Sequence, residues 1–180
     1  MLEKILKEIK EYALTIVIAL LFTTTFNTFF GLTSVNGESM YPTLNTGNKL
    51  IINKVAKMKN DINRGDIVVF DTTPDNPKKE KVFYVKRVIA KGGDTVKIFN
   101  GNVYVNGKKI KEDYADKENF LDELDETVIS DNCYFVLGDH RDNSYDSRNF
   151  GEIEHKQVVG KAVLQILPSI NTKKFTTPTS

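Results

Sequence analysis

The sequence predicts a mostly β protein, with antiparallel strands in a sheet or barrel-like arrangement behind one N-terminal membrane-spanning helix. Two observations lead to this prediction. No charged side chain occurs from Tyr12 to Gly37. Beyond that run, short segments rich in β-branched and aromatic residues alternate with glycine-containing turns, and little of this part has a helical period.

The uncharged run has the length and composition of a transmembrane anchor. Its apolar part, residues 12–30, would reach roughly 28 Å as a helix, which is close to the thickness of a bilayer's hydrocarbon core. Its five threonines are tolerable there because a helical threonine can bond its own backbone. A cleaved signal peptide fits less well, since no clear A-x-A site follows the run. A buried core helix of this length without any charge is unusual.

The flanking charges predict how the anchor is oriented. Lys4, Lys7 and Lys10 precede it, and no Lys or Arg follows until Lys49. The positive-inside rule then keeps residues 1–11 in the cytoplasm and puts the chain after residue 30 outside the membrane. Residues 1–11 have amphipathic helical spacing, so they either lie at the membrane surface or extend the anchor.

Residues 31–170 are expected to form the β domain. The pairs Asn100–Gly101 and Asn106–Gly107 bracket the strand NVYV as tight hairpin turns. Two polar excursions, 72–81 and 111–127, are predicted to be exposed, and the charges of the second are expected to face solvent. Residues 171–180 are expected to be a flexible tail. The other predicted strands are 49–55, 66–70, 81–90, 95–99, 133–139 and 158–167.

Composition limits the partners and cofactors. With 25 Lys and Arg against 24 Asp and Glu, the chain has no basic field that suggests a nucleic-acid partner. Two histidines and one cysteine do not suffice for a typical zinc cluster, and neither a metal nor another cofactor is expected. Cys133 begins an apolar strand and is interpreted as an inert core thiol.

Ser39 lies in the stretch VNGESMYPTLNTG, residues 35–47, whose Asn, Gly and Pro residues mark turns. The stretch is therefore either an ordinary surface turn or a platform for a nucleophile. A serine hydroxyl is a poor nucleophile unless a neighbouring base takes its proton. His140 beside Asp139 would allow a Ser–His–Asp triad, whereas nothing places His155 near Ser39.

Lys86 is the second candidate base. If side chains alternate across the strand, Lys86 shares an apolar face with Val82, Tyr84 and Val88. Burial can lower a lysine pKa from about 10.4 by up to about 3–5 units, which would leave a neutral amine able to accept a proton. Against this interpretation, most strand lysines extend to water.

Four segments resemble, in order and spacing, the conserved boxes of bacterial type I signal peptidases: GESMYPTL, RGDIVVF, YVKRVIAKGGD and LGDHRDNSYDSRNFG. The resemblance runs from the anchor to about Leu167. It implies a membrane-anchored Ser/Lys endopeptidase of the signal-peptidase β fold, which cleaves signal peptides from exported preproteins after small residues. The alternatives are a self-cleaving regulatory Ser/Lys protease and a membrane-tethered, non-catalytic β module or chaperone that binds exported chains.

The resemblance also implies roles for individual residues. Ser39 would be the nucleophile, Lys86 the general base, and Ser144 the residue that hydrogen-bonds and orients the lysine amine. Two positions depart from relatives: Gly37 stands where some have a serine that helps the oxyanion hole, and His140 stands where Asn is common, with no catalytic need for it.

The remaining expectations concern support and substrate binding. The resemblance implies that Asp146 and Arg148 form a buried ion pair, with Asp139 supporting that network. Met40 is expected either to form an apolar rim that touches lipid or to lie in the core. The residues expected to contact the substrate are Val35, Gly37, Met40, Phe83, Tyr84 and Val85.

Overall fold

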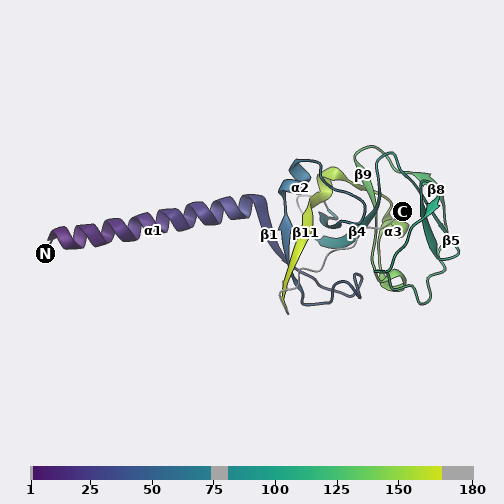
Figure 1. Ribbon diagram of the computed structural model, residues 1–180, viewed down its shortest axis with the longest axis horizontal. Coiled ribbons are helices and arrows are strands. Elements are labelled where there is room, and N and C mark those ends of the chain that lie inside the picture. The colour runs from purple at the N-terminus through teal and green to yellow at the C-terminus, as the bar shows by residue number, and fades with distance from the viewer. Residues whose placement is uncertain (1, 74–80, 168–180) are drawn as a thin grey trace.

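A computed structural model of the chain describes residues 2–73 and 81–167, in which one long helix precedes a body of β-strands (Figure 1). Helix α1, Leu2–Phe29, extends away from that body and is long and apolar enough to cross a membrane. Residues 2–11 and the apolar segment form one unbroken helix, so the N-terminal residues extend the anchor helix, one of the two arrangements predicted for them. The helix ends at Phe29 because Phe30 already pairs with Asn53.

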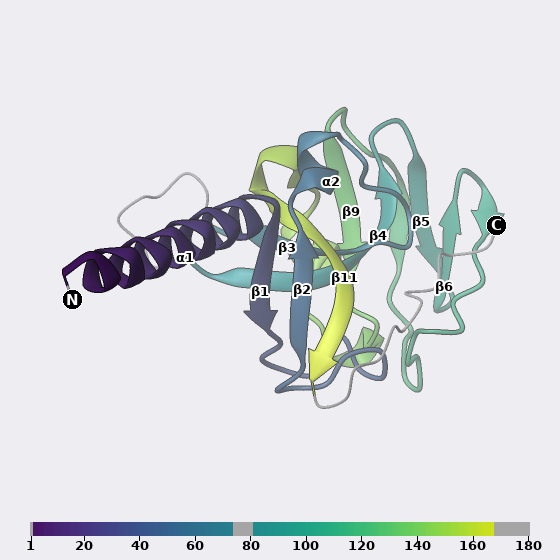
Figure 2. The same ribbon diagram turned by 60° about the vertical axis from the view of Figure 1, so that its left-hand side comes forward.

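The main sheet has seven antiparallel strands that curve around the body (Figure 2). Its strand order is β1 (Phe30–Ser34), β2 (Lys49–Asn53), β11 (Val158–Leu167), β3 (Ile67–Asp71), β4 (Phe83–Lys91), β9 (Cys133–Leu137) and β10 (Ile153–Glu154). Strands distant in sequence are therefore neighbours, and the long strand β11 joins β2 to β3.

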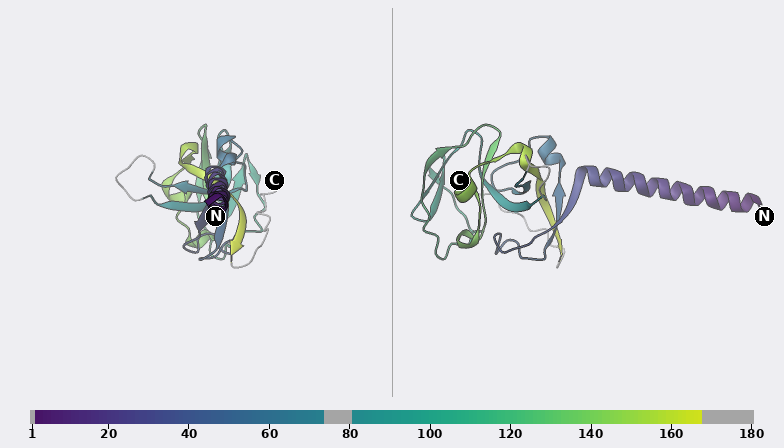
Figure 3. Two further views of the ribbon diagram at one scale, coloured as in Figure 1. Left: turned by 90° about the vertical axis from the view of Figure 1, so that its left-hand side faces the viewer. Right: turned by 180° about the vertical axis from the view of Figure 1, so that it is seen from behind.

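A smaller sheet of four strands lies at the end of the body remote from α1 (Figure 3). Its order is β7 (Lys108–Lys109), β6 (Asn102–Val105), β5 (Thr95–Phe99) and β8 (Leu124–Val128). Short helical turns complete the fold: α2 (Val55–Met58), η1 (Arg141–Asn143), α3 (Ser147–Phe150) and η2 (His155–Gln157).

The prediction of a mostly antiparallel β fold behind an apolar helix is confirmed. Both predicted Asn-Gly turns have the two positive φ angles that such hairpins require, 47° and 67° at Asn100 and Gly101, and 52° and 73° at Asn106 and Gly107. Strand β1 was not among the predicted strands, because its sequence FGLTS continues the uncharged run without any turn signal.

The prediction that residues 111–127 are exposed holds for most of that segment but is wrong at three positions. Glu112, Tyr114 and Phe120 are all buried, and the segment's end belongs to strand β8. The charge pattern could not reveal that arginines from elsewhere in the chain meet this segment. Residues 74–80 of the other excursion and the tail 171–180 lie outside the described residues.

The part of the core beneath the loop between β1 and β2 is apolar. Met40 is 1 % exposed and packs with Val35, Leu44 and Ile67, so the prediction of a lipid-touching rim is wrong and the core prediction is right. At the other side of the sheet, Cys133 is buried as predicted, and burial raises the pKa of its thiol to about 11.

Two glycines test the packing between strands. A Cβ at Gly160 of β11 would lie 2.6 Å from the carbonyl oxygen of Asn53 on β2, whereas at Gly31 of β1 the nearest atom is the flexible Lys54 Cε, at 3.2 Å. We therefore expect Gly160→Ala to lower the free energy of unfolding by about 1–3 kcal/mol and Gly31→Ala to change it by less than about 1 kcal/mol. Urea unfolding of the full chain in detergent measures both; equal effects would contradict the packing described.

Candidate active site

Ser39 lies in a loop that joins β1 to β2 and is closed at its base. The N–H of Val35 donates to the carbonyl of Asn48, and the N–H of Gly47 donates back to that of Val35, each at 2.9 Å. Gly37 has a φ of 100°, a left-handed conformation that a residue with a side chain rarely adopts. The turn residues of the sequence thus hold Ser39 on a fixed loop.

Lys86 on β4 contacts this serine. Its Nζ lies 2.6 Å from Ser39 Oγ, and the lysine is only 4 % exposed. The predicted alternation holds for Tyr84 and Val88, which both pack in the same apolar cluster, and Nζ lies 5.5 Å from the centroid of the Tyr84 ring. Val82 is 45 % exposed and does not belong to that apolar face.

Burial lowers the pKa of Lys86 from 10.5 to about 8. The negative charges of Asp146 and Asp139 raise this pKa, whereas the positive charge of Arg148 lowers it further. The unfolded chain keeps the higher pKa and binds more protons between these two values, so the stability of the fold rises as pH increases from about 8 to 10.5. At pH 7, about one molecule in ten then holds a neutral amine at this position.

Ser144 lies close to this pair but does not hydrogen-bond the lysine. Its Oγ is buried and has no hydrogen-bond partner in the described part of the chain, which corrects the expected contact with Lys86. Both serines pack against Gly138: a Cβ there would lie 2.2 Å from Ser144 Oγ and 2.4 Å from the Ser39 carbonyl oxygen. Only glycine therefore lets the 138–148 segment approach Ser39 this closely.

The histidines do not supply a base. His140 donates its backbone N–H to the Ser39 carbonyl at 3.1 Å, and its ring packs beside Tyr41, with its buried Nδ1 unbonded within the described residues. His155 bonds Tyr134 through Nδ1 instead. The geometry therefore gives no support to a Ser–His–Asp triad.

Asp146 and Arg148 form the ion pair that was expected. Arg148 donates from Nε and Nη2 to the two carboxylate oxygens of Asp146, both at 2.8 Å, and Asp146 is fully buried. Asp146 Oδ2 also accepts from the N–H of Gly138 at 2.9 Å. The pair thus joins helix α3 to Gly138, against which Ser39 packs.

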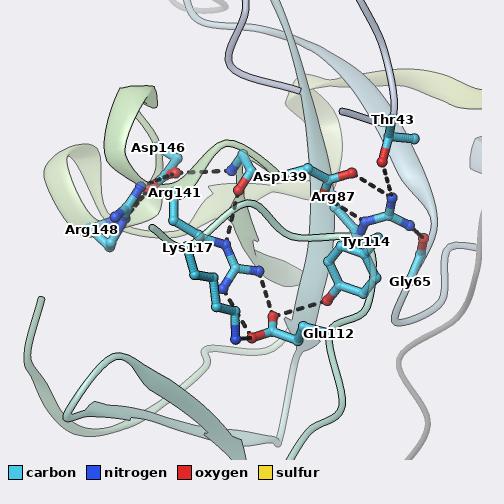
Figure 4. Close-up of polar contacts among 11 residues, drawn as sticks. Thr43, Gly65, Arg87, Glu112, Tyr114, Lys117, Asp139, Arg141, Asp146 and Arg148 are labelled. Carbon is cyan, nitrogen blue, oxygen red and sulfur yellow. Dashed lines mark hydrogen bonds and ion pairs between the residues drawn. The ribbon is translucent and has the colours of Figure 1, made fainter. Parts of the chain in front are cut away.

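Asp139 lies in a different network from the one predicted for it. Its carboxylate binds Arg87, the neighbour of Lys86, with N–O distances of 2.8 and 2.6 Å, and neither side chain is exposed. Arg87 also donates to the carbonyl of Gly65 and lies 4.0 Å from the ring centroid of Tyr114 (Figure 4). This pair ties strand β4 to the chain that follows β9.

A third ion pair, which was not predicted from the sequence, involves Glu112 and Arg141. Arg141 donates from both Nη atoms to the Glu112 carboxylate, and both residues are buried (Figure 4). Lys117 and Tyr114 also donate to that carboxylate, at 2.6 and 3.0 Å. Arg141 Nε donates to the carbonyl of Gly138, so this network too ends at the glycine beside the serine.

A cleft of about 480 Å³ opens above the Ser39–Lys86 pair. Its walls are the chain from Thr33 to Met40 on one side and Phe83–Lys86 on the other, with Asn143 and Tyr145 at the rim. All the residues that were expected to contact a substrate line this cleft, namely Val35, Gly37, Met40, Phe83, Tyr84 and Val85. Among the described residues, no group of His, Cys, Asp and Glu side chains is arranged to hold a metal ion.

A β domain behind an apolar helix, with a hydroxyl and a buried amine in contact under a cleft, has the features of a membrane-anchored hydrolase. The family model "Signal peptidase, peptidase S26" matches residues 9–167. The chain is 37 % identical to signal peptidase I S of Bacillus subtilis, over 93 % of this chain and 94 % of that protein. It is 43 % identical to signal peptidase I of Bacillus caldolyticus, over 74 % and 78 %.

A solved signal peptidase I from Enterococcus faecalis is 30 % identical to this chain and has a TM-score of 0.46, covering 55 % of this chain and 94 % of that one. The family match spans most of the chain, and the two Bacillus proteins align over about three quarters of it or more. The chain therefore belongs to the S26 family of signal peptidases.

Substitution of Glu112, with its neighbour Asp113 as the control position, tests the contribution of the buried network to stability. Removal of the Glu112 carboxylate leaves the Arg141 guanidinium buried without its counter-charge, so we expect Glu112→Ala to lower the free energy of unfolding by about 3–5 kcal/mol. Asp113 is 72 % exposed, so loss of its pair with the exposed Lys111 should change the free energy of unfolding far less. Urea titrations of both full-length variants measure the difference; a tolerant Glu112→Ala would disprove the role given to this network.

Proposed function

We propose that this chain is a signal peptidase I that cuts signal peptides from exported preproteins, with Ser39 as nucleophile and Lys86 as general base. The observation that carries the proposal is the 2.6 Å contact between a serine hydroxyl and a lysine amine whose pKa burial lowers to about 8. The membership of the S26 family and the names of the Bacillus relatives support it.

The substrate would bind as an added β-strand. Strand β1 is at the edge of the main sheet, and β4 pairs with β9 only from Arg87 onward, so Phe83–Lys86 has one edge without a partner strand among the described residues. These two edges face each other across the cleft. An extended peptide between them would satisfy main-chain hydrogen bonds on both sides, as in β-augmentation.

The side chains lining the cleft would select small residues. Val85 packs with Val35 and Met40 in one apolar cluster that is already filled by its own members. Alternate residues of an extended peptide point to the same side, so the residues one and three positions before the cut would face this cluster. Only small side chains such as Ala would fit there.

The chemistry follows from the contact between Ser39 and Lys86. The neutral amine takes the proton as Ser39 Oγ attacks the scissile carbonyl, and the resulting ammonium gives that proton to the leaving amine. Water, activated by the same amine, then hydrolyses the acyl-enzyme. The backbone N–H of Ser39 makes no hydrogen bond within the described residues and would donate to the oxyanion.

The helix α1 would hold the active site at the membrane. With the N-terminus in the cytoplasm, the β domain would lie on the outer side, where membrane lipid and the signal peptides of exported chains are its partners. Both enzyme and substrate would then be confined to one surface, which raises the effective concentration of each for the other.

Replacement of either partner of the pair should abolish cleavage. We expect Ser39→Ala and Lys86→Ala to cut a peptide containing an A-x-A site at least about 10³-fold more slowly than the unmodified chain. Lys91→Ala is the matched control, because Lys91 ends the same strand β4 but is exposed and remote from Ser39. Peptide cleavage by the detergent-solubilised full chain, with circular dichroism to monitor the fold, gives the result.

Each outcome of this comparison is informative. Full activity of the lysine variant would rule out Lys86 as the base. Peptide binding without cleavage by the unmodified chain would instead favour a tethered module that binds exported proteins.

The pKa of Lys86 also predicts a pH profile. The amine must be neutral to accept the serine proton, so kcat/KM should rise with pH and level off above about 8. Below that value it should fall about tenfold for each pH unit, because the protonated amine cannot act as a base. Initial rates between pH 6 and 10 test this, and a rate that is flat across pH 7 to 9 would contradict the assignment.

A further inference from the structure

A second hollow adjoins the catalytic cleft. Its volume, about 480 Å³, equals that of the cleft itself. Tyr84 and Tyr145 line both hollows, so the two form one surface divided by these rings. Nothing in the reaction of Ser39 and Lys86 requires this second space.

The second hollow is aromatic at its base. Phe70 packs edge-on against Tyr84, with ring centroids 6.1 Å apart, and lies 6.0 Å from Phe150. Tyr145 lies 5.6 Å from Phe150 and is 59 % exposed. Such a cluster of rings, open on one side, can hold another apolar side chain by stacking and by excluding water.

Successive side chains of β4 point to opposite faces of the sheet, and this alternation indicates which substrate residue would face the second hollow. Val85 points to the cluster of Val35 and Met40, whereas Tyr84 points to the opposite face and packs on Phe70. A peptide strand added beside β4 alternates in the same way. If its small residues face Val85, then the residue between them faces the side of Tyr84.

We propose that this aromatic hollow, lined by Phe70, Thr72, Tyr84, Tyr145 and Phe150, binds a bulky apolar side chain at the middle position of the substrate's A-x-A motif. The inference rests on the proposed function, since it assumes a peptide bound in the cleft. Glu152 also lines the hollow, so an acidic side chain would be repelled there. Preference at the middle position would then depend on residues that do not touch the reacting atoms.

The test uses three peptides that differ only in the middle residue of A-x-A: Phe, Ala and Asp. We expect kcat/KM for the Phe peptide to exceed that for the Ala peptide by about tenfold, the effect of filling an apolar pocket. The Asp peptide should be cut more slowly than the Ala peptide. Binding of the same peptides to the Ser39→Ala chain, followed by fluorescence anisotropy, should show the same order.

Two variants change the hollow in opposite ways. Thr72→Trp should fill it, because Thr72 lines this hollow and not the catalytic cleft, and its backbone N–H can keep its bond to the carbonyl of Val82. Phe150→Ala should remove part of its base. In each variant, we expect kcat/KM for the Phe peptide to differ from that for the Ala peptide by less than about twofold. Phe99→Ala on the remote small sheet is the control for loss of an exposed aromatic ring and should keep the ratio.

The two measurements separate this inference from the proposed function. Equal rates and equal binding for the Phe and Ala peptides, or a ratio that survives both variants, would overturn the inference while leaving cleavage intact. If the unmodified chain cuts no peptide, the proposed function fails, and binding to Ser39→Ala still decides whether the hollow recognises the bulky side chain.

Discussion

The site depends on keeping one amine out of water. Lys86 must be buried to lose its proton near neutral pH, yet a buried amine with no partner would destabilise the fold. The structure meets both conditions by placing Nζ against Ser39 Oγ on one side and the Tyr84 ring on the other. The carboxylate of Asp146 moderates the fall in pKa, so the amine stays titratable in an ordinary pH range.

Three buried ion pairs hold the parts of this site together, and all of them meet near Gly138. The pair of Asp146 with Arg148 reaches its N–H, and the pair of Glu112 with Arg141 reaches its carbonyl. Asp139, the next residue, binds Arg87, the neighbour of Lys86. Because every carboxylate has its partner, removal of Glu112, for example, would leave the buried guanidinium of Arg141 without its counter-charge.

Local sequence patterns marked two parts of the candidate site, and the resemblance of four segments to the signal-peptidase boxes implied the roles of their residues and of the supporting ones. The turn residues around Ser39 and the apolar strand around Lys86 were both recognisable, and the expected substrate-contacting residues all line one cleft. The contact of Ser144 with the lysine was not found, and Asp139 pairs with Arg87 and not with the network of Asp146 and Arg148 that it was expected to support. Ion pairs between distant segments depend on which chains become neighbours, and residue spacing carries no information about that choice.

By itself, the sequence determined the elements: an uncharged helix, short strands of alternating residues, Asn-Gly hairpins, and a punctuated loop bearing one serine. Periodicity and turn chemistry are local properties, so they can be read without knowing the fold. Only the tertiary structure decided that Ser39 and Lys86 are in contact and that Glu112 forms a buried ion pair with Arg141. It also decided that Tyr84 and Tyr145 line both the cleft and the second hollow. These are contacts between residues far apart in the chain, and they exist because the curved sheet brings its separate strands together.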